Sequence, residues 1–220
     1  MEKLLGRLAF HPNPALFIKD PLTSQVGMQI LSCSVNMLQE AGLEGLTFKK
    51  LASEMKSTEA TIYRYFTNKQ QLLMYIMSIY AALLQMRLVL ATTNISNPVD
   101  RLKEAIYSLM EVPKKDSQME GMKLIQLHSI WCAEMPRWMD GSLTDADLRK
   151  AWYQDLTELA DRIKQIIEES FQGTVCTEIH AWMILEWTQR LKQMERSNFP
   201  ISSNKSNHEQ FVESIIRMIA

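Results

Sequence analysis

The chain has 220 residues, of which 46% are hydrophobic and 22% are charged, and its formal net charge is −1. A chain of this length can build a core without disulfides or metals. Its seven glycines and seven prolines leave residues 143–171 and 174–196 free of both, which predicts long helices. Segments that alternate Val, Thr and Tyr between Gly-Asn or Asp-Gly turns are missing, so we predict an all-α fold of about nine helices.

The net charge is unevenly divided along the chain. Residues 1–75 contain eight Lys and Arg against six Asp and Glu, or +2, and residues 76–220 contain sixteen against nineteen, or −3. The N-terminal part is therefore mildly basic and the rest acidic. A difference of this size also fits chance, so charge alone favours no nucleic-acid function.

The three cysteines, Cys33, Cys132 and Cys176, are odd in number and far apart in apolar helical stretches. This pattern indicates reduced, buried thiols of a cytosolic protein, and neither a disulfide framework nor a metal site. The first ten residues include Arg7 and lack the apolar run of a signal peptide. We find no stretch of about 18 apolar residues, so we expect a soluble, cytoplasmic protein that does not contact membranes.

Prolines and glycines divide the N-terminal region. Residues 1–20 contain His11-Pro12-Asn13-Pro14 and predict an irregular arm. Asp20-Pro21 offers a helix cap, and apolar residues at helical spacing predict a first helix from Thr23 to Ala41. Gly42 then stops this helix.

Capping residues predict three more helices in the same region. Thr47, Thr58 and Asn68 precede helices over residues 48–55, 59–65 and 69–90. The predicted domains are an arm at 1–20, a three-helix, homeodomain-like head at 21–75 and a larger helical body at 76–220.

The rest of the body contains five more predicted helices. A capping box formed by Thr144 and Asp147 opens the longest of them, and Gly173 closes it. We place these helices, in chain order, from Pro98 to before Pro113, at 118–134 with an end at Pro136, from 144 to 171, at 176–196 and at 208–219.

The segment from Thr47 to Phe66 has the spacing of a helix-turn-helix. Two helices that cross steeply need a small residue where they touch, and Ala52 supplies it. Apolar residues suited to the shared core are Leu51, Met55, Ile62 and Tyr65. Spacing alone leaves an ordinary helical hairpin open as an alternative.

If the second of these helices reads DNA, its exposed face can be assigned. A recognition helix reads base edges with its N-terminal residues, so short side chains at its start allow close approach to the groove floor. Thr58 caps this helix, and the candidate groove-facing residues are Glu59, Ala60, Thr61 and Arg64. The candidate phosphate contacts are Thr47, Lys49, Lys50, Tyr63 and Lys69, together with the backbone N–H groups of the helix starts.

Two residues in the turn depart from the usual pattern. Lys56 stands where glycine is usual, because the chain tends to take a positive φ there. Keeping that conformation would cost on the order of 1 kcal/mol. Ser57 stands where an apolar residue is usual.

The same region resembles the N-terminal domain of the tetracycline-repressor (TetR/AcrR) family. The most specific part is Tyr63-Arg64-Tyr65-Phe66-Thr67-Asn68-Lys69 with Leu72-Leu73, and the match covers about residues 28–75. The resemblance implies a homodimeric repressor that binds a palindromic operator in double-stranded DNA. It further implies that a small molecule, bound in the C-terminal domain, moves the two DNA-reading heads apart. It assigns Thr58 as the cap of the recognition helix.

The body carries two clusters with less specific interpretations. A dense set of aromatic and sulfur-containing side chains fits either a hydrophobic core or the wall of an apolar effector pocket: Met122, His128, Trp131, Met135, Trp138 and Trp152. A second set fits a dimer face, as the last two helices form one in the family: Trp182, Trp187, Phe211, Ile215 and Met218.

Nothing in the sequence indicates an enzyme or a cofactor. His11, His128, His180 and His208 are scattered, and none pairs with Cys, Asp or Glu at metal-ligand spacing. We therefore expect no catalytic site, no metal and no cofactor. The alternative to a DNA-binding regulator is a helical protein-interaction module that kept the head fold, and a mixed charge pattern around Lys49, Lys50, Arg64 and Lys69 would favour it.

Overall fold

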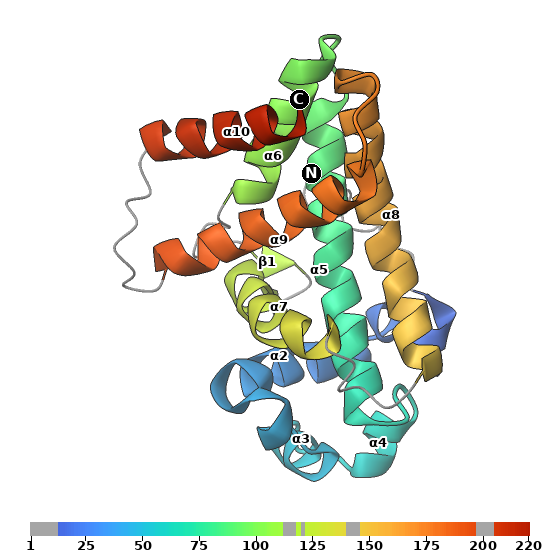
Figure 1. The fold of residues 1–220 in the computed structure, drawn as a ribbon. Helices are drawn as coiled ribbons and strands as arrows, with labels where there is room; N and C mark the ends of the chain where they lie inside the picture. Colours follow the sequence, from blue (N-terminus) through green and yellow to red (C-terminus); the bar gives the residue numbers. More distant parts are fainter. Residues whose placement is uncertain (1–12, 112–117, 120–121, 140–145, 197–204) are drawn as a thin grey trace. The chain divides into compact units, whose positions relative to one another are not determined.

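The computed structural model describes residues 13–111, 118–119, 122–139, 146–196 and 205–220. Within these ranges the chain forms nine α-helices, two 3₁₀ turns and one pair of two-residue strands (Figure 1). The predicted all-α fold is confirmed. The helices are α2 (Gln25–Gly45), α3 (Phe48–Glu54), α4 (Glu59–Tyr63), α5 (Lys69–Thr92), α6 (Pro98–Met110), α7 (Leu124–Met139), α8 (Ala146–Ser170), α9 (Thr177–Arg196) and α10 (Lys205–Ile219).

Packing divides the chain into two compact units. The first comprises residues 1–82 and 113–155, and the second comprises residues 83–112 and 156–220. Helices α5 and α8 each contribute to both units. The predicted functional division into arm, head and body stays a prediction, because compactness does not show where one function ends and another begins.

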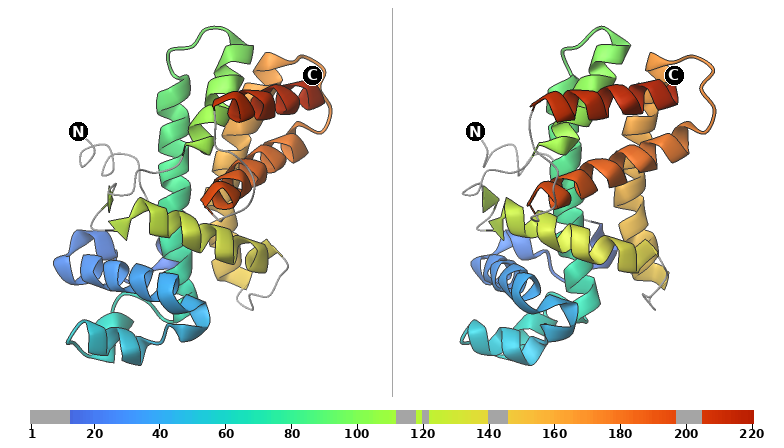
Figure 2. Two further views of the ribbon diagram at one scale, coloured as in Figure 1. Left: turned by 90° about the vertical axis from the view of Figure 1, so that its left-hand side faces the viewer. Right: turned by 60° about the vertical axis from the view of Figure 1, so that its left-hand side comes forward.

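In the first unit, α2, α3 and α4 gather around the first turns of α5 (Figures 1 and 2). Ser24 caps α2 by accepting a hydrogen bond from the Gly27 N–H at 3.1 Å. Asp20 instead caps the 3₁₀ turn Pro21–Thr23 that precedes this helix, so α2 starts two residues later than predicted. A Cβ at Gly27 would lie 2.2 Å from the Pro21 carbonyl oxygen, so only glycine allows the 3₁₀ turn to pack there.

Gly42 ends the regular part of α2, as its sequence position predicts. Its φ of 64° is in the left-handed region that glycine adopts without a steric penalty. The chain then reverses through Leu46, which is fully buried, and Thr47, which caps α3.

Helix α5 bears on the expectation that no segment crosses a membrane. It is long and apolar enough to cross a membrane, although polar residues such as Ser78 and Gln85 interrupt any continuous apolar run. Of its most apolar 18-residue window, 72% is buried inside the protein. The helix therefore has the burial of a central core helix, around which other elements pack.

The segment before α7 is also different from the prediction. Residues 118–123 were expected to be helical, but Gln118–Met119 (β1) pairs antiparallel with Met122–Lys123 (β2).

Helix α7 continues past Pro136, where an end was predicted. A proline near a helix end removes only one hydrogen bond, and the neighbouring Met135 is buried, so packing holds the last turn. Gln126 of α7 also donates to the Asn36 side chain of α2 at 3.0 Å. The capping box predicted at Thr144 lies outside the described residues.

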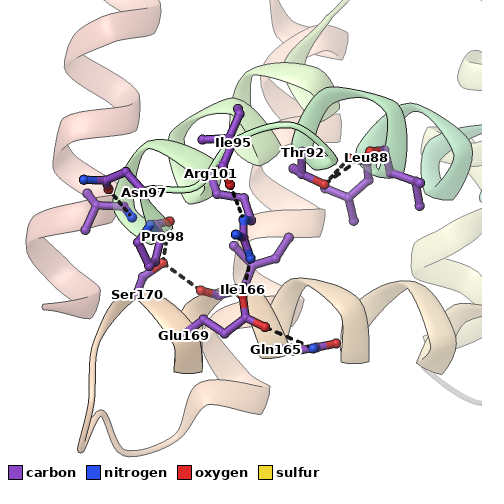
Figure 3. Close-up of polar contacts among 12 residues, drawn as sticks. Leu88, Thr92, Ile95, Asn97, Pro98, Arg101, Gln165, Ile166, Glu169 and Ser170 are labelled. Carbon is purple, nitrogen blue, oxygen red and sulfur yellow. Dashed lines mark hydrogen bonds and ion pairs between the residues drawn. The ribbon is translucent and has the colours of Figure 1, made fainter.

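The second unit is held together where the α5–α6 turn meets the end of α8 (Figure 3). Asn97 caps α6 by accepting from the N–H groups of Val99 and Asp100. Arg101 donates to the Ile95 carbonyl at 3.0 Å and forms an ion pair with Glu169. The Ser170 hydroxyl is within 2.8 Å of the Pro98 carbonyl oxygen. These contacts fix the turn between α5 and α6 against α8.

The remaining helices of this unit pack on α6. Gln189 of α9 donates to the Leu109 carbonyl at 3.1 Å, and Lys103 of α6 is paired with Glu213 of α10 at 2.8 Å. Gly173, with φ of 87°, lies just after the end of α8, as predicted.

Candidate nucleic-acid interface

The candidate interface is built on α3, α4 and the turn between them. The Thr47 hydroxyl caps α3 by accepting from the Lys50 N–H at 3.2 Å. Leu51, Ala52 and Met55 are buried, as the helix-turn-helix spacing requires. Lys49 and Lys50 are exposed on the other side of the helix, where their charges can face a phosphate backbone, and the Lys50 ammonium also donates to the Gly45 carbonyl at 3.3 Å.

The turn after α3 is a Schellman motif, the hydrogen-bonded end that glycine normally completes. The Ser57 N–H donates to the Ala52 carbonyl at 2.9 Å, and the Lys56 N–H donates to the Ser53 carbonyl at 3.1 Å. Lys56 occupies the left-handed position with φ of 50°. The conformation expected from the family pattern is therefore kept. Because lysine has a Cβ, this left-handed conformation is sterically unfavourable for it.

Thr58 precedes α4 but does not cap it with its side chain, which corrects the sequence prediction. Its hydroxyl lies 3.1 Å from the Thr61 hydroxyl, which also accepts from the Ser57 hydroxyl at 3.1 Å. Three neighbouring hydroxyls thus bond to one another in place of a cap. Thr61 is half-buried in this cluster.

The outer face of α4 carries most of the predicted groove-facing residues. Glu59, Ala60 and Arg64 are exposed, and the opposite residue Ile62 is fully buried. Tyr63 is 50% exposed and packs edge-on against Phe48 of α3, with ring centroids 5.0 Å apart. This contact holds the phenol ring between the two helices with one side in solvent.

The charges over residues 47–66 are mixed but mainly basic. Four exposed cations, Lys49, Lys50, Lys56 and Arg64, stand against the two exposed anions Glu54 and Glu59, or +2.

Lys69, the remaining cation predicted to contact DNA, is held by the protein. Its ammonium donates to the Leu43 carbonyl at 3.0 Å and pairs with Glu44 at 3.5 Å, and its side chain is 34% exposed. These contacts tie the start of α5 to the end of α2, a structural role that the sequence did not indicate.

The predicted effector-pocket residues form an aromatic cluster in the first unit. Met122, His128, Trp131, Met135 and Trp152 are each at most 4% exposed. The side chain of Trp138 lies outside the described residues. Trp131 of α7 and Trp152 of α8 are in contact with a centroid separation of 6.4 Å, and Trp131 also packs on Tyr80 of α5.

A polar group lies within this apolar cluster. The Tyr80 hydroxyl is 3.0 Å from Nδ1 of His128, and the Cys132 sulfur is 3.7 Å from the same ring. Burial of hydrogen-bonded polar groups among aromatic rings fits both a satisfied core and a binding wall.

Comparison with known proteins bears directly on the head. Residues 30–76 match the family model of bacterial regulatory proteins of the tetR family. The matched range begins in α2 and includes α3, the Schellman turn, α4 and the start of α5.

Residues 30–76 therefore form an N-terminal domain of the tetR-family type. The matching model is that of bacterial regulatory proteins.

Solved structures extend the likeness of fold to most of the chain. A regulatory protein of the tetR family from Rhodococcus RHA1 aligns with a TM-score of 0.67 at 16% identity, covering 90% of this chain and 98% of its own. AibR in complex with isovaleryl coenzyme A and operator DNA aligns with a TM-score of 0.61 at 18% identity, covering 86% and 95%. KstR2 of Mycobacterium tuberculosis, a ketosteroid transcriptional regulator, aligns with a TM-score of 0.61 at 14% identity, covering 90% and 95%.

A similarity to curated proteins is confined to a part of the chain. The nucleoid occlusion factor SlmA of Haemophilus influenzae is 26% identical over 89 residues. The match spans 40% of this chain and 41% of that protein, less than half the length of either.

The residues predicted for the dimer face lie in the second unit and differ in exposure. Trp187 and Met218 are 38% and 41% exposed, and Trp182 and Phe211 are half-buried. Ile215 is only 2% exposed, so it belongs to the core of its own subunit, a correction to the prediction. Sequence reasoning missed Ile179, which is 58% exposed two turns before Trp187 on α9.

Two further findings concern the titratable side chains. Burial raises the pKa of the Glu134 carboxyl, with Arg137 opposing the shift. Among the described residues, no group of three or more His, Cys, Asp or Glu side chains is arranged to hold a metal ion.

The strained turn gives a first prediction. We expect Lys56→Gly to increase the free energy of unfolding by about 0.5–1 kcal/mol, because relief of the left-handed penalty exceeds the entropic cost of glycine. Lys56→Ala keeps a Cβ at the same φ and serves as the matched control. Urea denaturation at fixed protein concentration measures both, and a glycine variant no more stable than the alanine variant would contradict the strain.

Proposed function

We propose that this protein is a homodimeric repressor that binds a palindromic operator and leaves it when a small, largely apolar ligand binds the body. The observation that carries the proposal is the arrangement of α3, the turn and α4. The crossing is buried at Ala52, and Glu59, Ala60 and Arg64 point to solvent from the second helix. Such a pair presents its second helix to a DNA major groove.

The proposed contacts divide into two classes. Lys49, Lys50, Tyr63 and Thr47 position the protein on phosphates, and the start of α4 with Thr61 and Arg64 reads bases. Lys69 contributes chiefly by holding α2 and α5 together, since its ammonium is already engaged by Leu43 and Glu44. Over residues 47–66 the exposed cations outnumber the exposed anions by two, which supports DNA over a protein as the partner.

Phosphate and base contacts respond differently to substitution, which provides a test. We expect Lys49→Ala to weaken binding to all DNA sequences alike and to lower the slope of log K against log salt by about 0.9. Thr61→Ala should instead change the preferred sequence at one base pair, by about 1–3 kcal/mol. Binding competition over a randomised operator library at several salt concentrations measures both effects.

The control for charge loss is Lys150→Ala, which removes an exposed lysine from α8. It should leave the slope and the sequence preference unchanged. Uniform weakening by Thr61→Ala, with no change of preferred sequence, would contradict the assignment of this residue to the groove. Failure of the wild-type protein to select any palindrome would instead favour a protein-interaction module.

The proposed dimer face lies on α9 and α10. Ile179, Met183 and Trp187 recur at four-residue intervals and therefore share one face of α9. On the opposite face, Ala181, Ile184 and Leu185 are buried within the subunit. An exposed apolar stripe on a helix that already buries its other side supports association with a second copy.

A charge in the middle of this stripe should separate the protomers. We expect Trp187→Asp to be monomeric in sedimentation velocity and to lose operator affinity, because a carboxylate is costly to bury in an apolar interface. Leu90→Asp places the same charge at a 57% exposed leucine of α5 and serves as the control. A dimeric Trp187→Asp protein would exclude α9 as the interface.

The proposed effector site is the aromatic cluster around Trp131 and Trp152. Apolar walls with one polar group at Tyr80 and His128 favour a ligand that is mostly hydrocarbon and carries a single hydrogen-bonding group. The similar folds of AibR, with isovaleryl coenzyme A, and of the ketosteroid regulator KstR2 support small-molecule control in general. We expect regulation in the cytoplasm and no catalytic role.

The chemistry of the effector can be tested without knowing its identity. We expect a neutral ketosteroid or a medium-chain fatty acid to raise the melting temperature, quench tryptophan fluorescence and release operator DNA, because a ligand that binds only the folded form stabilises it. Choline, a permanent cation, should have none of these effects. A response to choline alone would contradict an apolar site.

A further inference from the structure

Residues 13–20, which the sequence left without a role, join two distant parts of the first unit. We call this segment the strap. At one end, the Asn13 amide donates to the Ala151 carbonyl and to Oε1 of Gln154 on α8, both at 3.3 Å. The first turns of α8 belong to the same compact unit as the strap. The Asn13 carbonyl and side-chain oxygens also organise the 3₁₀ turn Pro14–Leu16.

At its other end the strap contacts the residues that follow the recognition helix. The Ile18 N–H donates to the Tyr65 carbonyl at 2.7 Å, and the Lys19 ammonium lies 5.4 Å from the centre of the Tyr65 ring. The Tyr65 hydroxyl is 2.8 Å from that of Ser24, which caps α2. Tyr65, two residues beyond the last residue of α4, is therefore held by its backbone, its ring and its hydroxyl.

The middle of the strap is fastened to α5. Leu16 is fully buried, and Gln71 donates to the Ala15 carbonyl at 3.0 Å. Phe17 packs edge-on against Tyr75, whose hydroxyl donates to the Asp20 carboxylate at 2.9 Å. Burial and the neighbouring Asp20 raise the pKa of the Tyr75 phenol, so it stays a hydrogen-bond donor at neutral pH. These contacts fasten the strap to α5 from Ala15 to Asp20.

We infer that the strap is a positioning element for operator reading, which couples the first turns of α8 to the recognition helix α4. The five residues of α4 are too few to hold a fixed position alone, because isolated short helices are marginal in water. The bonds from Ile18 and Ser24 to Tyr65 fix the end of this helix, and Asn13 fixes the strap to α8. A displacement of α8 near Ala151 thus reaches α4.

The effect of this coupling on DNA binding rests on the proposed function. Trp152 follows Ala151 directly and packs on Trp131 in the proposed effector cluster. A ligand that moves Trp152 would move the carbonyl to which Asn13 donates, and so change the position in which α4 meets DNA. The route runs along the strap, whose middle is fastened to α5, and gives the N-terminal segment a part in the response.

The test separates the strap from the local cap that Asn13 also provides. Asn13→Asp keeps the oxygen that accepts from the Ala15 N–H and removes the donor to α8. We expect backbone amides of Ile18 and of residues 62–66 to exchange with solvent about three- to tenfold faster in this variant, the effect of losing hydrogen bonds of ordinary strength. Operator affinity should fall by a similar factor with an unchanged salt slope.

Variants on α8 and α2 complete the design. Gln154→Ala should speed exchange at the same head amides although it changes no residue of the strap, and Gln154→Glu, which keeps an acceptor, should restore wild-type rates. Gln39→Ala, an exposed glutamine of α2, is the matched control. Faster exchange confined to residues 13–16 in Asn13→Asp would overturn the coupling. Exchange is measured without DNA, so a wild-type protein that binds no operator would refute the proposed function and leave this test intact.

Discussion

The burial of Ile62, Tyr65 and Phe66 is the constraint on which the head depends. Helix α4 has five residues, and its N-terminal threonine forms no side-chain cap. A helix of this length has too few internal hydrogen bonds to be stable alone. Three buried side chains within and just after it, each at most 3% exposed, hold it against the core of the first unit. The buried residues on the opposite side of the helix therefore set the position of the exposed residues Glu59, Ala60 and Arg64.

The same dependence explains why a costly turn is tolerated. Lys56 takes a left-handed conformation that glycine would adopt without strain, yet both hydrogen bonds of the Schellman motif are formed around it. The surrounding buried residues, Ala52 and Ile62 among them, over-determine the path of the chain, so packing overrides local preference. A lysine at this position adds a cation beside the two lysines of α3, which suits a surface facing phosphates.

Sequence patterns predicted the features that follow from local rules, and missed those that depend on tertiary packing. Gly42 ends a helix, Thr47 caps one and Pro98 begins one as expected, because backbone conformation and hydrogen-bonding groups act within a few residues. The hairpin before α7, the helix that continues through Pro136 and the burial of Ile215 depend on distant partners. So does the role of Asn13, whose α8 partners lie more than 130 residues away. The exposed surface of α4 could be predicted, since it follows from helical periodicity once Ile62 is placed inside.

Footprinting of the wild-type protein on the DNA that flanks its own gene tests most directly whether the head reads a palindromic sequence. Two protected half-sites should appear, with centres about 34–36 Å apart or a multiple of this distance, as for a symmetric pair of recognition helices. Protection should weaken steeply as salt is raised, because phosphate contacts release counterions. Protection without sequence preference would contradict palindrome reading by the head. So would the absence of protection at low salt, both on this DNA and on a randomised library.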